Sequence, residues 1–261
     1  MTKQDSNIML PTTKVNSRDL APYALVVGPL SRVRKAAAMM HDVREIGCNR
    51  EYLTITGTYE GQRLTVASHG VGACSANIIF MELMHGGVHT LIRAGTCGAT
   101  DPDIDDGDFT IVTGAVREDL ATESLMPLAY PAFADLDILN ALIASANKRG
   151  YKKPHIGIGI TGANFYPSPI LPSQYEKYEK YLTCGIKTVD LETAPLFVVA
   201  HMQGARAGSI LTSDGNSARE KGPKDPFGYN PYREVVDKGI EAMLEVALGA
   251  LASLAAAREQ R

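Results

Sequence analysis

Several features that would point to a particular function are missing from this sequence of 261 residues. Positive charge is not in excess, since the formal net charge is -3, and this disfavours a nucleic acid as the main partner. No GxxxxGK(S/T) pattern occurs, so binding of a nucleoside triphosphate is not indicated. The sequence contains neither an HExxH nor a CxxC pattern, and we predict no metal site.

Cysteine pairs and long apolar runs are missing as well. The four cysteines show no CxxC spacing, which disfavours a disulfide framework and fits free thiols in a reducing compartment. No run reaches the roughly 18 consecutive apolar residues of a membrane span, and the first twenty residues lack the apolar segment of a signal peptide. We therefore expect a soluble, cytoplasmic protein that binds neither membranes nor nucleic acids.

What the sequence does contain is an alternation of strand and helix patterns, and 45% hydrophobic residues that can form a sizeable core. Short apolar segments predict strands at Ala24–Val27, Leu53–Tyr59, Leu64–Ser68, Thr90–Arg93, Asp108–Thr113, His155–Ile160, Thr188–Leu191 and Arg206–Thr212. Helices are predicted at Ser31–Met40, Cys74–His85, Asp137–Arg149, Thr193–Gln203 and Tyr232–Ala257, with a polar helix or turn at Gln174–Tyr181. This alternation predicts an α/β fold: an N-terminal arm (1–22) and a single domain (23–261) with a mixed, twisted sheet flanked by helices.

The segment Leu91–Thr100, LIRAGTCGAT, reads as a short strand that ends at Arg93 and breaks into a loop of small residues. A cation beside exposed amides and the hydroxyl of Thr96 suits an oxyanion. A tight turn with a surface arginine explains the segment equally well. Functional sites in α/β sheets lie at the carboxyl ends of strands, where this segment falls.

A second candidate anion site is Gly28–Arg32, GPLSR, directly after a predicted strand. Gly28 lets a ligand approach the backbone, and a guanidinium at a helix N-terminus attracts anions. The alternative is an ordinary strand–helix turn. Paired with Arg93, Arg32 could close on one tetrahedral anion. Arg50 and Glu51, in contrast, predict by themselves only a surface ion pair.

Three carboxylates and a pair of aromatic residues could serve a nucleoside. Strand periodicity puts Asp190 and Glu192 on one face, where a carboxylate can accept hydrogen bonds from two vicinal ribose hydroxyls; Glu192 could equally stabilise the start of the next helix. Asp214 emerges from an apolar strand and could be a general acid or could cap a turn. The aromatic residues of Asn164–Pro167 could stack on a base or lie in the core.

The order of the motifs GPLSR, CNREY, SHGVG, IRAGTCG, NFYP, VDLE and SDG resembles the nucleoside phosphorylase-I family, closest to its hexameric purine nucleoside phosphorylases, with the uridine phosphorylases as near relatives. The resemblance covers Ala24 to Asp214. It implies phosphorolysis of a nucleoside to free base and (deoxy)ribose 1-phosphate, with inorganic phosphate as co-substrate and no cofactor. It also implies a homo-oligomer, expected to be a hexamer built as a trimer of dimers.

By the same resemblance, the site residues fall into two groups. Those implied to hold phosphate are Gly28, Arg32, Arg93 and Thr96, with Arg50 completing a neighbouring subunit's site. Those implied to bind the nucleoside are Val71, Gly95, Phe165, Asp190, Leu191, Glu192 and Asp214. Glu192 would take the 2′- and 3′-hydroxyls, and Asp214 would protonate the leaving base. Preorganised charge that stabilises the transition state is the largest expected contribution to catalysis.

Uridine phosphorylases carry a glutamine and an arginine where this chain has Pro169 and Leu171, so the resemblance favours purine nucleosides. The retained Arg32 and Arg93 favour phosphate over water as the nucleophile. A uridine or broad-specificity phosphorylase and a non-catalytic nucleoside-binding relative are the alternatives. The loop 214–231 is expected to contact the edge of the base, and Arg219, Lys221 and Lys224 are the candidates there to assist Asp214.

The sequence departs from the family pattern in three places. GPLSR replaces the usual GDPxR, which removes an aspartate near the phosphate. No histidine precedes His41, and the arm carries Ile8, Met9 and Leu10 instead, so a 5′-deoxy or 5′-alkylthio nucleoside becomes a candidate substrate. Asp190 is shorter than the usual glutamate of this motif.

Overall fold

The computed structural model of the protein describes residues 7–151, 154–166, 170, 179–218 and 229–259. The strands are β1 (Tyr23–Val27), β2 (His41–Asn49), β3 (Tyr52–Tyr59), β4 (Gln62–Ser68), β5 (Thr90–Ala99), β6 (Phe109–Glu118), β7 (Ala132–Phe133), β8 (His155–Gly162), β9 (Thr188–Asp190) and β10 (Arg206–Asn216). The α-helices are α1 (Leu30–Ala38), α2 (Ala73–His85), α3 (Leu136–Lys148), α5 (Thr193–Met202) and α6 (Glu234–Glu259).

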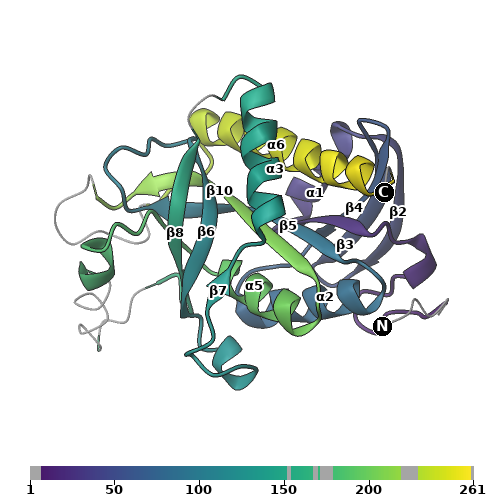
Figure 1. Ribbon diagram of the computed structural model, residues 1–261, viewed down its shortest axis with the longest axis horizontal. Helices are drawn as coiled ribbons and strands as arrows, with labels where there is room; N and C mark the ends of the chain where they lie inside the picture. The colour runs from purple at the N-terminus through teal and green to yellow at the C-terminus, as the bar shows by residue number, and fades with distance from the viewer. Residues whose placement is uncertain (1–6, 152–153, 167–169, 171–178, 219–228, 260–261) are drawn as a thin grey trace.

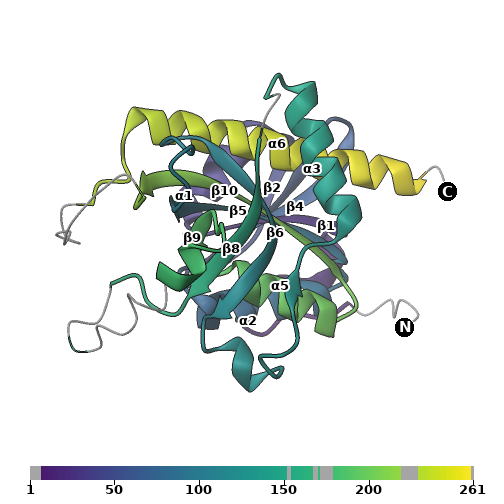
Figure 2. The ribbon, with the colours of Figure 1, turned by 60° about the vertical axis from the view of Figure 1, so that its left-hand side comes forward.

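One mixed sheet runs through the molecule and partly closes on itself (Figure 2). Its strand order is β10-β6-β8-β9-β5-β1-β4-β3-β2, and β10 also pairs with β5. Five strands therefore form a ring, from which β1, β4, β3 and β2 extend as an open sheet. Strand β1 runs parallel to β4 and to β5, and β5 runs parallel to β10. The carboxyl ends of these four strands therefore point toward the same edge of the sheet. The predicted α/β fold with a mixed sheet is confirmed.

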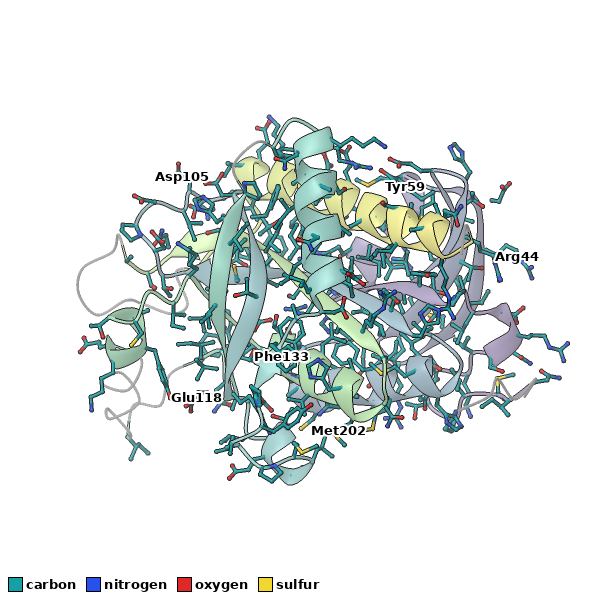
Figure 3. The ribbon with its side chains drawn as sticks, in the orientation of Figure 1. Arg44, Tyr59, Asp105, Glu118, Phe133 and Met202 are labelled. Atoms are coloured by element: carbon teal, nitrogen blue, oxygen red, sulfur yellow. The ribbon has the colours of Figure 1, made fainter. Side chains whose placement is uncertain are left out.

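Helices cover both faces of this sheet. Helices α1, α3 and α6 lie on one face and α2 and α5 on the other (Figure 1). Side chains fill the space between helices and strands (Figure 3) and form two apolar cores. One core contains Leu25 of β1 and Leu244 of α6, and the other contains Phe80 of α2 and Phe197 of α5. Burial of each such side chain contributes roughly 1.5–3 kcal/mol.

Helix α6 is long and apolar enough to cross a membrane by length and composition. However, 56% of its apolar window is buried inside the fold. The helix packs on α3 and on several strands through residues such as Met243, Leu248 and Leu251. Its apolar composition is thus explained by its place in the core.

The predicted loop after Arg93 is wrong, because β5 continues to Ala99. The small residues of this stretch belong to the ring, where β5 pairs with β10 on one side and with β9 on the other. Likewise β10 continues to Asn216, so that Asp214 lies within the strand at an irregularity between Ser213 and Gly215. A small residue is required at Gly95 by the packing of the Arg93 side chain and does not mark a loop.

Two further segments differ from the expectation. Strand β2 was missed, because most of its residues are exposed and its sequence HDVREIGCN lacks the alternation of a half-buried strand. Helix α1 begins at Leu30 after Pro29, with no side-chain cap from Ser31. Most of the predicted segment Gln174–Tyr181 lies outside the described residues, as do Pro169, Leu171, Arg219, Lys221 and Lys224.

The N-terminal residues that the structure describes lie against α2. The carboxylate of Glu82 accepts hydrogen bonds from the backbone N–H groups of Thr12 (2.7 Å) and Thr13 (2.8 Å). Leu10 is fully buried in the core beside α2, whereas the side chain of Met9 is exposed. Of the apolar residues that replace the expected histidine, Leu10 is therefore used by the chain's own core.

Candidate active site

Four of the motifs come together where β1 and β4 end beside β5 and β10, which continue past this point. Gly28 follows β1 and His69 follows β4, and the two turns are joined by a hydrogen bond from the N–H of Gly70 to the carbonyl of Gly28 (3.0 Å). Arg93 lies in β5, and Asp214 lies in β10. These residues thus lie toward one edge of the sheet, and their roles in binding stay predictions.

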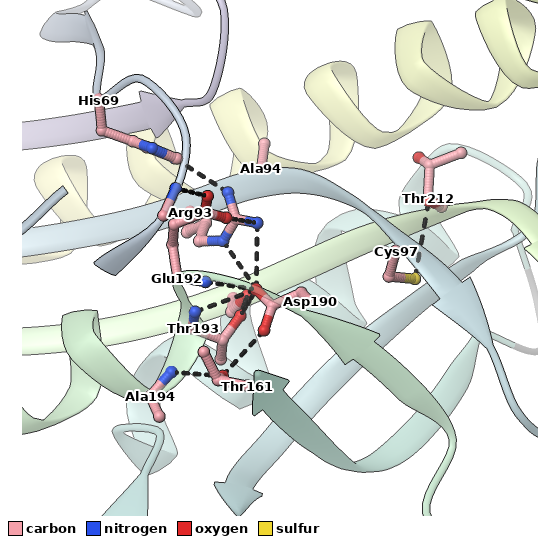
Figure 4. A network of polar contacts seen from close by, with 12 residues as sticks. His69, Arg93, Ala94, Cys97, Thr161, Asp190, Glu192, Thr193, Ala194 and Thr212 are labelled. Carbon is pink, nitrogen blue, oxygen red and sulfur yellow. Dashed lines mark hydrogen bonds and ion pairs between the residues drawn. The ribbon is translucent and has the colours of Figure 1, made fainter. Parts of the chain in front are cut away.

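At the centre lies Arg93, whose side chain is almost completely buried (Figure 4). Its Nε and Nη2 contact Oδ2 of Asp190 at 3.1 and 3.0 Å, and Nη2 also contacts Oε2 of Glu192 at 2.7 Å. Its Nη1 lies 2.9 Å from Nε2 of His69. Burial opposes the charge of Arg93, but Glu192 and Asp190 outweigh it, so the pKa of the guanidinium is raised. Four of the five N–H groups of a guanidinium are thereby used within the chain.

His69, to which no role was assigned from the sequence, is a direct partner of Arg93. Its Nδ1 lies 2.9 Å from the carbonyl of Gly70, to which it must donate, so its Nε2 accepts from Arg93. Burial, and then the charge of Arg93, lower the pKa of His69 well below its ordinary value. The ring is therefore neutral. The signal in the sequence was the motif SHGVG, in which only Val71 was assigned a role.

Asp190 is held on all sides by its own chain. Its Oδ1 accepts from the hydroxyl of Thr161 (2.8 Å), and its Oδ2 accepts from the hydroxyl and the N–H of Thr193 (2.6 and 3.0 Å). These contacts tie the end of β9 to the start of α5 and aim the carboxylate at Arg93. A direct contact of Asp190 with a nucleoside stays a prediction.

Glu192 precedes the first residue of α5 and makes no side-chain cap. Its Oε1 accepts a hydrogen bond of 2.6 Å from the N–H of Gly72, and its Oε2 pairs with Arg93. Burial and the neighbouring carboxylate of Asp190 raise the pKa of Glu192, although Arg93 opposes the shift. Each oxygen of an ionised carboxylate has a second lone pair, which here is available to a hydroxyl group.

Arg32, in the first turn of α1, is a buried cation without a counter-ion. Its Nη1 donates to the carbonyl of Ala94 (3.2 Å), and no carboxylate of the described residues lies within ion-pair distance. Burial, and then the charge of Arg93, lower the pKa of Arg32 to about 10. A methyl group at Gly28 would meet only ordinary van der Waals contacts, the nearest being the carbonyl oxygen of Gly70 at 3.7 Å. A buried cation of this kind attracts an anion.

Asp214 is buried near the other end of the site. Burial raises the pKa of its carboxyl group, against hydrogen bonds from the hydroxyls of Tyr229 and Thr96 and against the charge of Arg32. Tyr229 was missed in the sequence, because it follows a long loop with no strand or helix pattern. The hydroxyl of Thr96, implied to hold phosphate, thus also contacts the candidate acid.

The remaining candidates are more exposed. Val71 and Phe165 are 78% and 53% exposed, and Leu191 is half-buried. The ring of Phe165 contacts that of Tyr229 at a centroid distance of 5.3 Å. Arg50 is exposed in the turn between β2 and β3 and makes no ion pair with a described residue. In the described part of the chain, no group of three His, Cys, Asp or Glu side chains is placed to hold a metal ion.

Comparison with known proteins identifies the family. Residues 22–252 match the phosphorylase superfamily. The chain belongs to this superfamily. The purine nucleoside phosphorylase of Plasmodium falciparum is 34% identical over 248 residues, which are 95% of this chain and 97% of that protein. The uridine phosphorylase of Thermococcus kodakarensis is 35% identical over 206 residues, 76% of this chain and 74% of that protein.

A solved structure agrees with this assignment. The crystal structure of the purine nucleoside phosphorylase of Toxoplasma gondii in complex with immucillin-H has a TM-score of 0.88 to this chain, with 30% identity and 100% coverage of both chains. The protein is an enzyme of the nucleoside phosphorylase family, and its substrates are a nucleoside and phosphate. The purine and uridine enzymes among its relatives are about equally similar to it.

Proposed function

We propose that this phosphorylase acts on purine nucleosides and releases the free base and (deoxy)ribose 1-phosphate. The observation that carries this proposal is Asp214, a buried carboxyl group whose pKa is raised by burial and which lies beside the aromatic ring of Tyr229. A carboxyl group whose pKa is raised holds its proton more readily and can pass it to a ring nitrogen of a departing purine. Two hydroxyl groups, of Tyr229 and Thr96, orient it.

Phosphate is proposed to bind beside Arg32, with the backbone of Gly28 and the hydroxyl of Thr96. Arg32 has the charge and lacks a counter-ion among the described residues. Arg93 can supply one further N–H, because its other four contact Asp190, Glu192 and His69. Its larger role is to hold Glu192, which accepts hydrogen bonds from the ribose hydroxyls.

The proposed reaction uses these side chains together. Phosphate attacks the anomeric carbon as the bond to the base breaks, and positive charge develops on the sugar. Arg32 positions the attacking anion, Glu192 holds the sugar, and Asp214 donates a proton to the base. Protonation of the leaving group typically contributes about 10²–10⁴-fold to the rate.

A homo-oligomer completes this proposal, with the partner subunit's Arg50 at the phosphate. Support comes from the exposure of Arg50 and from its place beside the site. The hydroxyl of Ser75 lies 3.0 Å from Oε1 of the neighbouring Glu51 and 2.7 Å from the carbonyl oxygen of His69. A hexamer is expected from the family resemblance. Size-exclusion chromatography with light scattering tests this, and an Arg50→Ala variant should raise the KM for phosphate without unfolding the protein.

The second candidate is a uridine or broad-specificity phosphorylase, favoured by the 35% identity to the uridine phosphorylase of Thermococcus kodakarensis. One assay separates the candidates: inosine, adenosine, uridine and methylthioadenosine are each incubated with and without phosphate, and base release is measured. Phosphate-dependent release of purines supports the proposal. Faster turnover of uridine would contradict it, and no release at all would favour a non-catalytic binding protein.

A matched pair of variants tests the acid. Asp214→Asn removes the proton donor and should reduce purine turnover by about 10²–10⁴-fold, with little change in phosphate binding. Asp137→Asn changes an exposed carboxylate of the same type and should leave turnover unchanged. Equal activity of the two variants would exclude Asp214 as the acid.

A further inference from the structure

Tyr229 contacts two groups that the proposed function uses, and neither the motifs nor the family resemblance assigns it a role. Its hydroxyl lies beside the carboxyl group of Asp214 and favours the ionised form of that group. Its ring packs on Phe165, with centroids 5.3 Å apart and planes inclined by 56°. The side chain is 40% exposed. It therefore spans from the buried acid to the open side of the site.

We propose that Tyr229 is a positioning residue for the purine base: its hydroxyl aims the carboxyl group of Asp214, and its ring forms one wall of the base site together with Phe165. This proposal rests on the proposed function, since it assumes that Asp214 protonates the base. The base would lie along the wall formed by the two rings, with its ring nitrogen toward Asp214.

A phenol is well suited to hold a carboxyl group that must give up a proton. Its hydroxyl can donate to the ionised carboxylate and can accept from the protonated acid. The contact with Asp214 is thus available before and after proton transfer. The hydroxyl of Thr96 on β5 has the same property. A lysine or arginine in this place would instead hold Asp214 ionised, which opposes its role as an acid.

The charged and titratable groups around Asp214 come from several elements. Arg32 on α1 is near enough to favour the ionised carboxylate, and the Cys97 thiol on β5 faces it, with a pKa raised by burial and by Asp214. Arg233, which precedes α6, donates to the backbone carbonyl of Asp214 (2.7 Å) and pairs with Asp106. Among the described residues, the hydroxyls of Tyr229 and Thr96 act on the carboxyl group itself and lower its pKa.

The surroundings of Tyr229 keep its hydroxyl protonated. Burial, and then the carboxylate of Asp214, raise the pKa of Tyr229 above its ordinary value, so the phenol stays protonated. Its hydrogen bond in turn lowers the pKa of Asp214. Removal of the hydroxyl should therefore raise the pKa of Asp214, and the direction of this change can be measured.

The experiment compares Tyr229→Phe, Tyr229→Ala and the control Tyr232→Phe in the full-length enzyme with inosine and phosphate. Tyr232 is 94% exposed, so its hydroxyl is a matched control. Turnover should fall with rising pH as Asp214 loses its proton. In Tyr229→Phe we expect this fall to move to higher pH and kcat on the low-pH side to drop about tenfold, with KM for inosine nearly unchanged, because the ring remains. In Tyr229→Ala we expect KM to rise a further threefold to tenfold, as for a lost aromatic contact.

The outcomes separate this proposal from the proposed function. A wild-type enzyme without phosphate-dependent purine turnover would overturn both. An active wild-type enzyme whose pH profile is the same in Tyr229→Phe would overturn the role of Tyr229 alone. A uniform loss of kcat at every pH, with a lowered melting temperature, would indicate a structural role only. A shifted profile with an unchanged melting temperature, absent in Tyr232→Phe, supports the proposal.

Discussion

Gly95 lies directly beneath the guanidinium of Arg93. A methyl group at Gly95 would come within 2.5 Å of Cζ and Nη2 of that side chain. Since residues two apart on a strand share a face, the side chain of Arg93 can fold over Gly95 only because no side chain is there. The glycine thus shapes the site through the arginine, and its role as a lining residue for the nucleoside stays a prediction.

Gly95→Ala should therefore displace Arg93 and disturb its contacts with Glu192 and His69. We expect kcat/KM to fall on the order of 10²-fold, the usual effect of a misplacement of about 1 Å in an active site. Steady-state phosphorolysis measures it. Gly98→Ala on the same strand is the control, because a methyl group there meets nothing within 4 Å. Equal losses in both variants would argue against the packing of Arg93 as the cause.

Asp190 should contribute strongly to the stability of the fold, because its buried carboxylate pairs with Arg93 and accepts several hydrogen bonds. Its removal leaves Arg93 with one carboxylate partner and frees the hydroxyls of Thr161 and Thr193 in a buried place. Breaking a buried ion pair from one side usually costs about 3–5 kcal/mol. We expect Asp190→Ala to lower the free energy of unfolding in urea by about this amount, and Asp137→Ala, at an exposed site, to change it by less than about 0.5 kcal/mol.

The sequence predicted which motifs meet, and it predicted less well how they meet. Parallel strands bring their carboxyl ends together whatever their exact length, so Gly28, Arg93 and Asp214 were correctly grouped. The length of β5 was underestimated, because glycines within a closed ring of strands look like a loop in the sequence. The partners of Arg93 were not predictable either, since they depend on which side chains face the same buried volume.

His69 and Tyr229 show two different limits of the sequence. His69 stands within the motif SHGVG, and only the tertiary contact with Arg93 reveals the use of its ring. Tyr229 follows the undescribed residues 219–228, and no local pattern connects it with Asp214, fifteen residues earlier in the chain. Long-range side-chain contacts of this kind follow from the fold as a whole.

Lowering the pH should decrease the free energy of unfolding, because His69 is held neutral in the folded protein. Its folded pKa is lowered well below the ordinary value of about 6.5, so the unfolded chain binds one more proton once the pH falls below that value. The stabilisation from the neutral ring is complete above about pH 6.5 and is lost as the pH falls toward the folded pKa. We expect the free energy of unfolding in urea to decrease by up to about 1.4 kcal/mol per pH unit in this range.

His201 contributes in the same direction, because burial lowers its pKa too. A His69→Gln variant should show a shallower dependence on pH between about pH 5 and 6.5 than the wild type, and His201→Gln provides the comparison for the second ring. A slope that is unchanged in His69→Gln would mean that His69 is protonated in the folded protein or that other groups control the acid limit.

Replacing Arg93 should lower the free energy of unfolding, whereas replacing Arg32 should not, although both are buried arginines at the proposed phosphate site. Arg93 is paired with two carboxylates, so Arg93→Met leaves Asp190 and Glu192 buried without their cation and should destabilise the fold by about 3–5 kcal/mol. Arg32 makes no ion pair with a described residue, and burial disfavours its charge more than the nearby Asp214 and Glu192 favour it. Arg32→Met should therefore leave the free energy of unfolding unchanged or increase it.

The same variant should raise the KM for phosphate by roughly 10- to 100-fold, as expected for the loss of a hydrogen bond between charged groups. Urea denaturation and phosphate titrations of both variants measure the contrast. A strong destabilisation in Arg32→Met would mean that Arg32 has a structural partner, and an unchanged KM would remove it from the phosphate site.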